Sequence, residues 1–159
     1  MKNFKKSSIL TLILLLALSL MVGCGGTGTD EPEATGYVDG EYYAEMPEFD
    51  DNGWKDNATV TIKDGKIADV VLNSNNEDPA KGDKLTAVAN GEYDMKAAGA
   101  QAGWDEQVKA IEDYIIENQG ATGVTFDEEG KSDAISGATI HYNQFFDLVN
   151  QALEQAKAE

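Results

Sequence analysis

The residues best suited to chemistry stand near the C-terminal end, in the stretch Asp133-Ala-Ile-Ser-Gly-Ala-Thr139. Small residues at 136–138 come directly before the Thr139 hydroxyl, so a large group could reach that oxygen. An apolar pattern follows and predicts a helix from about residue 138 to 156, with Ser136 as its N-cap. Thr139 would then lie in the first turn, where free backbone N–H groups and the helix dipole favour an anion such as phosphate.

These seven residues resemble the D-x-x-S/T-G-A-T motif of FMN-binding domains that carry covalently attached flavin. The segments "DGEYYAE", "VTIKDGKIADV", "WDEQVKAIEDYIIENQG" and "HYNQFFDLVNQAL" extend the resemblance over most of residues 37–158. They look like single-domain extracellular electron-transfer lipoproteins of this family, which is related to the FMN-bearing subunits of sodium-pumping redox complexes.

The resemblance implies a specific attachment chemistry. FMN would be joined to the Thr139 oxygen through a phosphoester, installed by a separate FMN transferase that uses FAD as donor. Ser136, Gly137 and Ala138 would surround the phosphate, and Asp133 would be the motif acid, which the transferase could read. Because the transferase would supply the base and the metal, this chain needs no activated nucleophile of its own.

The N-terminus has the composition of a secretory signal peptide, predicted to span residues 1–23. Three lysines precede an apolar run from Ile9 to Val22, which is too short for a comfortable membrane span. Cys24 follows at the expected cleavage point, in a context that resembles a bacterial lipobox. This predicts an acylated Cys24 that anchors the protein to the membrane lipid on its extracytoplasmic side. An ordinary signal peptide with a chance cysteine is the alternative.

Composition and charge limit the domain organisation and the classes of partner that this protein could have. Residues 24–36 carry no large apolar side chain and predict a flexible tether, whereas residues 37–159 have the length of one domain. The formal net charge is −17, and removal of the three lysines before residue 24 would make it about −20. Such a surface argues against nucleic acid and favours cationic partners. The single cysteine excludes an internal disulfide, and no metal site is predicted.

The periodicity predicts an α+β domain, with a largely antiparallel sheet and helices packed on it. A strand is expected within 39–46 and a hairpin across 57–72 around Asp64-Gly65. A bulge near the turn would place Ala58 beside Leu72, Val60 beside Val70 and Ile62 beside Ala68. A helix is predicted over 104–118 with Gly120 as its stop, and a further strand over 124–126.

Several other residues could border a flavin ring. Candidates are Trp54, Trp104, Tyr42, Tyr43 and Met95, although core packing is the simpler interpretation and suits Trp104 best. His141, the single histidine, could approach the cofactor but fits a partly exposed helix position better. The polar stretch 73–103 is long enough to lie over a binding site, with a short helix possible at 93–100. Residues 48–57 cluster carboxylates but lack the spacing of a calcium loop.

Together these features predict an electron carrier rather than an enzyme. A lipid-anchored flavoprotein would accept electrons from a membrane donor, a quinone or flavin dehydrogenase system, and pass them to an extracytoplasmic acceptor. The rival hypotheses are a ligand-binding lipoprotein and a structural surface module, both without flavin. A ligand receptor generally needs two lobes around a cleft, which this length does not favour.

Overall fold

The computed structural model describes residues 36–158 of the 159-residue chain. The predicted signal peptide, Cys24 and all of the predicted tether except Gly36 lie outside these residues. The elements in order are β1 (Gly40–Glu45), β2 (Trp54–Lys63), β3 (Lys66–Asn76), α2 (Lys84–Ala89), α3 (Trp104–Asn118) and α4 (Asn143–Gln155). This confirms the predicted α+β class and single domain. Within residues 36–158, no helix has the length and apolar character needed to cross a bilayer.

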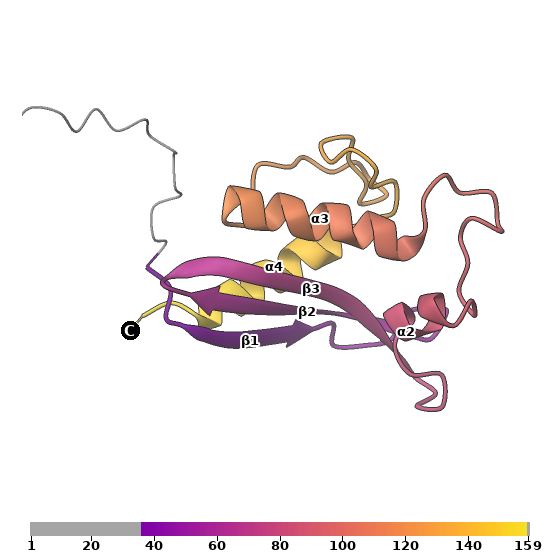
Figure 1. Ribbon diagram of the computed structural model, residues 1–159, viewed down its shortest axis with the longest axis horizontal. Coiled ribbons are helices and arrows are strands. Elements are labelled where there is room, and N and C mark those ends of the chain that lie inside the picture. The colour runs from indigo at the N-terminus through magenta and orange to yellow at the C-terminus, as the bar shows by residue number, and fades with distance from the viewer. Residues whose placement is uncertain (1–35, 159) are drawn as a thin grey trace, which may run out of the picture. The chain divides into compact units, whose positions relative to one another are not determined.

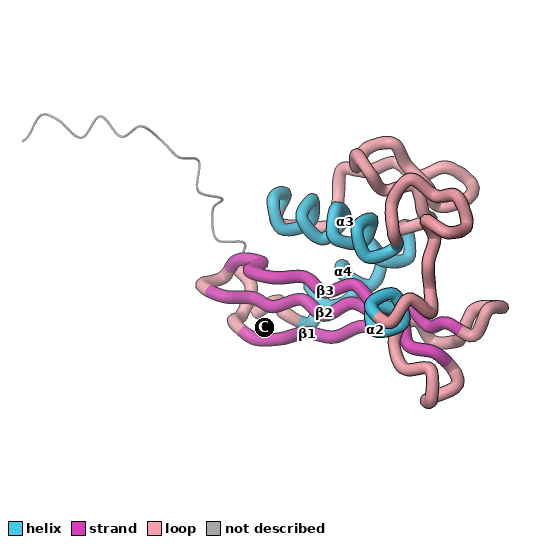
Figure 2. Tube along the Cα trace, turned by 45° about the vertical axis from the view of Figure 1, so that its right-hand side comes forward, coloured by secondary structure: helices cyan, strands magenta, loops and turns pink. Residues whose placement is uncertain are grey.

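The three strands form one antiparallel sheet in the order β1-β2-β3. Helix α3 packs over β3, and α4 packs over β1 and β2, so both helices cover one face of the sheet (Figures 1 and 2). The alternating side chains of β2 explain this arrangement, because Ala58, Val60 and Ile62 are buried beneath the helices. On the opposite face Tyr43 and Val71 are exposed.

The hairpin between β2 and β3 contains the predicted bulge. Ala58 pairs with Leu72 and Val60 with Val70, as predicted, and the register shifts between Thr61 and Ile62. Ile62 then lies opposite Ile67, so the expected partner Ala68 is wrong. Ala68 is instead the additional residue and is exposed, whereas Ile67 is 2% exposed. The bulge therefore places the larger apolar side chain in the core.

Helix α3 has the predicted bounds, and its stripe Trp104, Val108, Ile111 and Ile115 is buried. Its end differs in one detail from the prediction. Gly120 N donates to Ile115 O, but the left-handed residue is Gln119, with φ of 53°. The Gln119 side chain accepts from Ile67 N at 2.8 Å and donates to Ile67 O at 3.0 Å, and this bridge to β3 fixes the helix end.

Helix α4 begins at Asn143, so the predicted start near Ala138 and the N-cap role of Ser136 are both wrong. Gly137 has φ of +90°, which is incompatible with a right-handed helix. The Gly130 carbonyl accepts from Tyr142 N at 2.9 Å and Asn143 N at 3.3 Å, and so fixes the true entry into the helix. The predicted apolar face of the helix, including Phe145 and Val149, is buried.

Two shorter elements differ from the predictions. Residues 124–126 form no strand, because Phe126 packs edge-on against the rings of Tyr142 and Phe146, at 5.1 and 5.3 Å, instead of joining the sheet. Residues 95–99 form turns rather than a helix. The helix within the long polar stretch is α2, which sequence patterns did not predict because it is only six residues long.

Candidate functional site

Thr139 lies in the segment between the Gly137 turn and α4, where its side chain is exposed. One buried side chain holds it there. The amide oxygen of Gln107 accepts hydrogen bonds from Thr139 N at 2.8 Å, from Thr139 Oγ1 at 3.1 Å and from Ile140 N at 3.1 Å. The backbone N–H groups that were expected to await an anion at a helix start are therefore bound by Gln107 instead.

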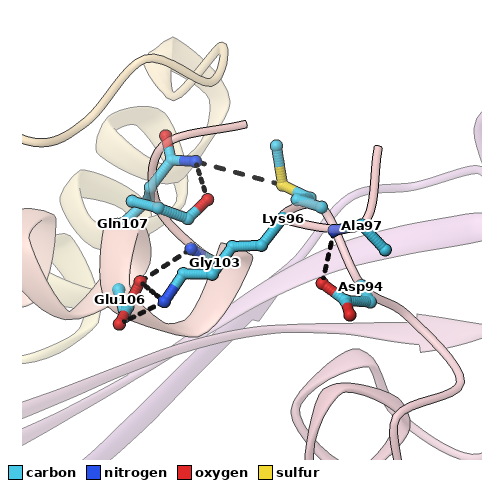
Figure 3. A network of polar contacts seen from close by, with 8 residues as sticks. Asp94, Lys96, Ala97, Gly103, Glu106 and Gln107 are labelled. Carbon is cyan, nitrogen blue, oxygen red and sulfur yellow. Dashed lines mark hydrogen bonds and ion pairs between the residues drawn. The ribbon is translucent and has the colours of Figure 1, made fainter. Parts of the chain in front are cut away.

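Gln107 is fully buried, at 0% exposure, yet both the oxygen and the nitrogen of its side-chain amide form hydrogen bonds. Its amide nitrogen donates to Ala102 O at 3.2 Å and lies 3.9 Å from Met95 Sδ (Figure 3). One neutral side chain thus joins α3, the loop before it and the Thr139 segment. Sequence reasoning missed Gln107. The available signal was a polar residue three positions after Trp104, on the apolar stripe of α3.

The loop that leads into α3 is held by hydrogen bonds and an ion pair at the protein surface. Glu106 accepts from Gly103 N at 2.8 Å and forms an ion pair with Lys96, and Asp94 accepts from Ala97 N at 3.0 Å (Figure 3). The Lys96 ammonium and the Gly103 N–H hold the pKa of Glu106 below its usual value. These contacts fix the start of α3, and therefore the position of Gln107.

The other motif residues divide between two environments. Ala138, Thr139 and Asp133 line a cavity of about 480 Å³, together with Lys131. Ser136 and Gly137 are exposed and do not line that cavity. The segment is supported from behind by Tyr142, which is fully buried and donates through its hydroxyl to Ser132 O at 3.2 Å.

A larger cavity has a volume of about 650 Å³. It is lined by Ile140 and His141, the two residues that follow Thr139 in the sequence. Two residues of extended chain span about 7 Å at most, so Thr139 stands close to both cavities. The remaining walls come mainly from aromatic, acidic and basic side chains: Phe49, Trp54, Tyr93, Trp104, Phe145, Glu48, Asp50, Asp56 and Lys84. This volume and this mixture suit a small aromatic ligand.

Lys84 is the unexpected member of this lining. Its side chain is 8% exposed, and its ammonium lies 4.7 Å from the ring centroid of Trp54, 5.2 Å from that of Trp104 and 5.3 Å from that of Tyr93. Burial lowers the pKa of Lys84, while the charges of Asp56 and Asp50 act in the opposite direction. Sequence reasoning missed this residue, because nothing in the pattern of a polar stretch marks one lysine as buried.

The structure separates the residues expected to border a flavin ring. Trp54 and Trp104 line the larger cavity, and Trp104 also packs at 6.3 Å against Phe145. Tyr42, Tyr43 and Met95 do not line it. His141 is exposed, stands before the helix rather than within it, and lies at the cavity.

The acidic loop before β2 is organised by its own backbone. Asp50 Oδ1 accepts from Asn52 N at 2.9 Å and from Trp54 N at 2.7 Å. In the described part of the chain, no group of three or more His, Cys, Asp or Glu residues is arranged to hold a metal ion. The hydrogen bond from Trp54 N to Asp50 helps to place Trp54 at the larger cavity.

The residues present fit FMN. The exposed Thr139 lines the smaller cavity and is adjacent in sequence to Ile140 of the larger one. The larger cavity has aromatic walls that could contact a flat ring, with polar side chains for its edge. Thr139 and Ala138, at the smaller cavity, would hold the phosphate end. Trp54, Tyr93 and Trp104 would hold the ring.

Comparisons with known proteins agree with this fit. The family model for the FMN-binding domain matches residues 53–154. A solution NMR structure of a protein from Clostridium thermocellum is 46% identical, with a TM-score of 0.59, over 76% of this chain and 92% of that one. A crystal structure of a protein from Clostridium perfringens is 29% identical, with a TM-score of 0.58, over 76% and 88%. No curated protein matches. This chain belongs to the FMN-binding domain family.

Proposed function

We propose that this protein is a lipid-anchored extracytoplasmic electron carrier whose FMN is joined through a phosphoester to Thr139. The observation that supports this most directly is the position of Thr139 itself. Thr139 is exposed and lines the smaller cavity, the next residue, Ile140, lines the larger one, and the Thr139 backbone is fixed by the buried Gln107. A fixed backbone and an accessible hydroxyl are what a separate transferase needs in an acceptor residue.

Esterification of Thr139 would remove one contact and keep the others. The hydroxyl would no longer donate to Gln107, but the N–H groups of Thr139 and Ile140 would still do so. The segment would therefore stay in place when it is modified. Ala138 is buried and leaves the approach to the oxygen open, and Asp133, exposed at the same cavity, is available to the transferase.

The bound FMN would supply one- and two-electron transfer, and the chain would supply position and electrostatics. The aromatic walls would contact the ring and limit its access to water. The remaining parts of the proposal come from the sequence. The signal-like residues 1–23 and Cys24 support attachment to membrane lipid, and the net charge of −17 supports salt-sensitive encounters with cationic redox partners. The donor would be a quinone or flavin dehydrogenase system of the membrane.

The proposal is tested by determining whether FMN is attached to the Thr139 oxygen. Full-length protein produced together with an FMN transferase should be yellow, and its intact mass should rise by one FMN-phosphoryl group. Thr139→Val removes the hydroxyl at almost constant volume and should abolish the increase in mass. The control is Thr125→Val, which alters an exposed threonine at the same cavity and should leave the modification complete.

A wild-type protein that stays colourless and unmodified beside an active transferase would contradict this function. It would favour a ligand-binding or structural surface lipoprotein. A modified Thr139→Val variant would place the attachment at another residue.

A further inference from the structure

Lys84 is held in place by the start of α2. The Asp83 carboxylate accepts from Thr86 N at 3.0 Å and caps the helix, and it also accepts from the Asn73 side chain on β3 at 2.8 Å. Asn73 in turn accepts from Leu85 N at 3.2 Å. The first residue of α2 is therefore tied to the sheet, and the Lys84 side chain is directed among the three rings of the larger cavity.

The ammonium of Lys84 has no hydrogen bond or ion pair with any of residues 36–158. The contrast with the lysines of the surface is clear. Lys96, Lys131 and Lys157 each pair with a glutamate and have side chains that are 44–56% exposed. Burial of an ammonium that no carboxylate contacts directly is costly, even with the charges of Asp56 and Asp50 nearby, and this favours a functional role for the charge. Contacts with aromatic faces stabilise the cation but leave it able to meet an anion.

Charged groups around the cavity define what the cation can do. Asp50 and Asp56 act on Lys84 through space, and Asp56 is also the acceptor for the Ser74 hydroxyl on β3. Glu48 and His141 complete the titratable side chains of the lining, together with Tyr93, whose pKa is raised by burial. Lys84 is the single lysine in this lining. It is thus the fixed positive charge available to a ligand in this cavity.

We propose that the ammonium of Lys84 compensates the negative charge that the flavin ring gains on reduction, and thereby raises its reduction potential. This inference rests on the FMN function proposed above. Two electrons from an external quinol or reduced flavin, with one proton from solvent taken up at ring N5, leave one negative charge shared by ring atoms N1 and O2. A cation enclosed by aromatic walls stabilises that charge more strongly than water does.

The alternative for Lys84 is purely structural, since its side chain fills space between Trp54, Tyr93 and Trp104. The two roles differ in what they require. Packing requires the aliphatic stem, which methionine reproduces closely. Compensation of charge requires the ammonium. Lys84→Met therefore separates them, because it keeps most of the volume and removes only the charge.

The experiment measures the midpoint potential of the flavinylated protein by spectroelectrochemical titration. In Lys84→Met we expect the potential to shift to a more negative value, with the equilibrium constant for two-electron reduction falling at least tenfold, which corresponds to about 30 mV. Lys109→Met is the matched control, because it removes the same charge from an exposed position on α3. Its potential should stay within about 10 mV of the wild-type value.

Lys84→Gln, a smaller neutral replacement, is measured in parallel in case Lys84→Met fails to fold, and the same negative shift is expected. A yellow Lys84→Met or Lys84→Gln variant with the wild-type potential would overturn the role of Lys84 and leave the flavin function standing. A shift of equal size in Lys109→Met would also overturn it, since net charge alone would then explain the effect. A colourless wild-type protein would overturn the function itself, and this inference with it.

Discussion

Helix α3 holds two buried polar side chains on its inner face, and they are satisfied in different ways. Gln107, near the N-terminal end, is neutral and uses every polar atom of its amide. Glu112 is 8% exposed and accepts from Leu72 N at 2.9 Å. Burial raises the pKa of Glu112 to about 7, against the opposing effects of the Leu72 N–H and Lys109.

The difference shows how one helix can serve two purposes. At the site, an uncharged amide fixes the Thr139 segment in a way that does not depend on pH. At the sheet, a carboxylate joins α3 to β3 through a bond whose energetic balance changes near neutrality. Substitutions at Gln107 and Glu112 test the two ends of α3, and a substitution at Gly130 tests the other support of the Thr139 segment. The largest effect is expected at Gln107 and the smallest at Glu112.

The largest effect is expected from Gln107→Leu. The replacement keeps the apolar volume but removes the acceptor for two backbone N–H groups, Thr139 and Ile140, and the donor to Ala102 O. Unfolding free energy from urea titration should fall by about 3 kcal/mol, because buried polar groups lose their partners. Flavin attachment at Thr139 should fall as well, since its segment is released. Gln151→Leu, at an exposed position of α4, should change stability by less than about 0.5 kcal/mol. Equal losses in the two variants would remove the special role of Gln107.

A smaller loss is expected from Gly130→Ala, which acts on the second support of the same segment. Gly130 has φ of +75°, and an added Cβ would clash with Asn143 Oδ1. Strain and crowding together should lower the unfolding free energy by about 2 kcal/mol. Gly99→Ala separates the two causes, because Gly99 also has positive φ but has open space around it. Its loss should be near 1 kcal/mol. A Gly130→Ala variant no less stable than Gly99→Ala would show that Asn143 moves aside freely.

The smallest effect, and the one that depends on pH, is expected from Glu112→Gln. The pKa of Glu112 is raised from 4.5 to about 7 in the folded protein, so its contribution is complete below pH 4.5 and is lost as the pH rises through 7. Glutamine keeps the acceptor for Leu72 N without the charge. Relative to wild type, the variant should therefore gain about 1 kcal/mol in stability between pH 5 and pH 8.

Glu117→Gln provides the control for that titration, because it makes the same chemical change at an exposed position of the same helix. Its stability relative to wild type should vary by less than about 0.5 kcal/mol over the same range. If Glu112→Gln shows no greater dependence on pH than this control, the contrast between the two ends of α3 is wrong.

The sequence predicted the elements whose signals are local. Strand β1, the β2–β3 hairpin with its bulge and helix α3 follow from alternation, from the Asp64-Gly65 turn and from the apolar stripe of the helix. The start of α4 could not be predicted in the same way. It depends on Gly130 and on Gln107, the latter 32 residues away from Thr139, and no local pattern reports such distant acceptors.

The site followed the same division. Residue types and order marked 133–139 as a candidate site, and the structure places Asp133, Ala138 and Thr139 at one cavity but leaves Ser136 and Gly137 outside it. Ring chemistry marked Trp54, whereas core packing was the preferred prediction for Trp104, which is buried and also lines the larger cavity. The cavity itself was not foreseen, because Lys84 and Tyr93 reach it only when α2 folds against the edge of β3. The attachment chemistry at Thr139 and the anchor at Cys24 remain predictions.

The way the chain enters the domain has a practical consequence. Tyr37 pairs with Lys157, and Val38 N donates to Ala156 O at 2.8 Å, so both ends of the domain lie beside the last turn of α4. The larger cavity lies at the first turn of that helix, through Gln144 and Phe145. Thirteen residues of helix, about 20 Å, separate the two. If either end of the domain were attached to an electrode or a bead, the larger cavity would therefore face away from the support. If copies were fused in series, the cavity of each copy would remain open.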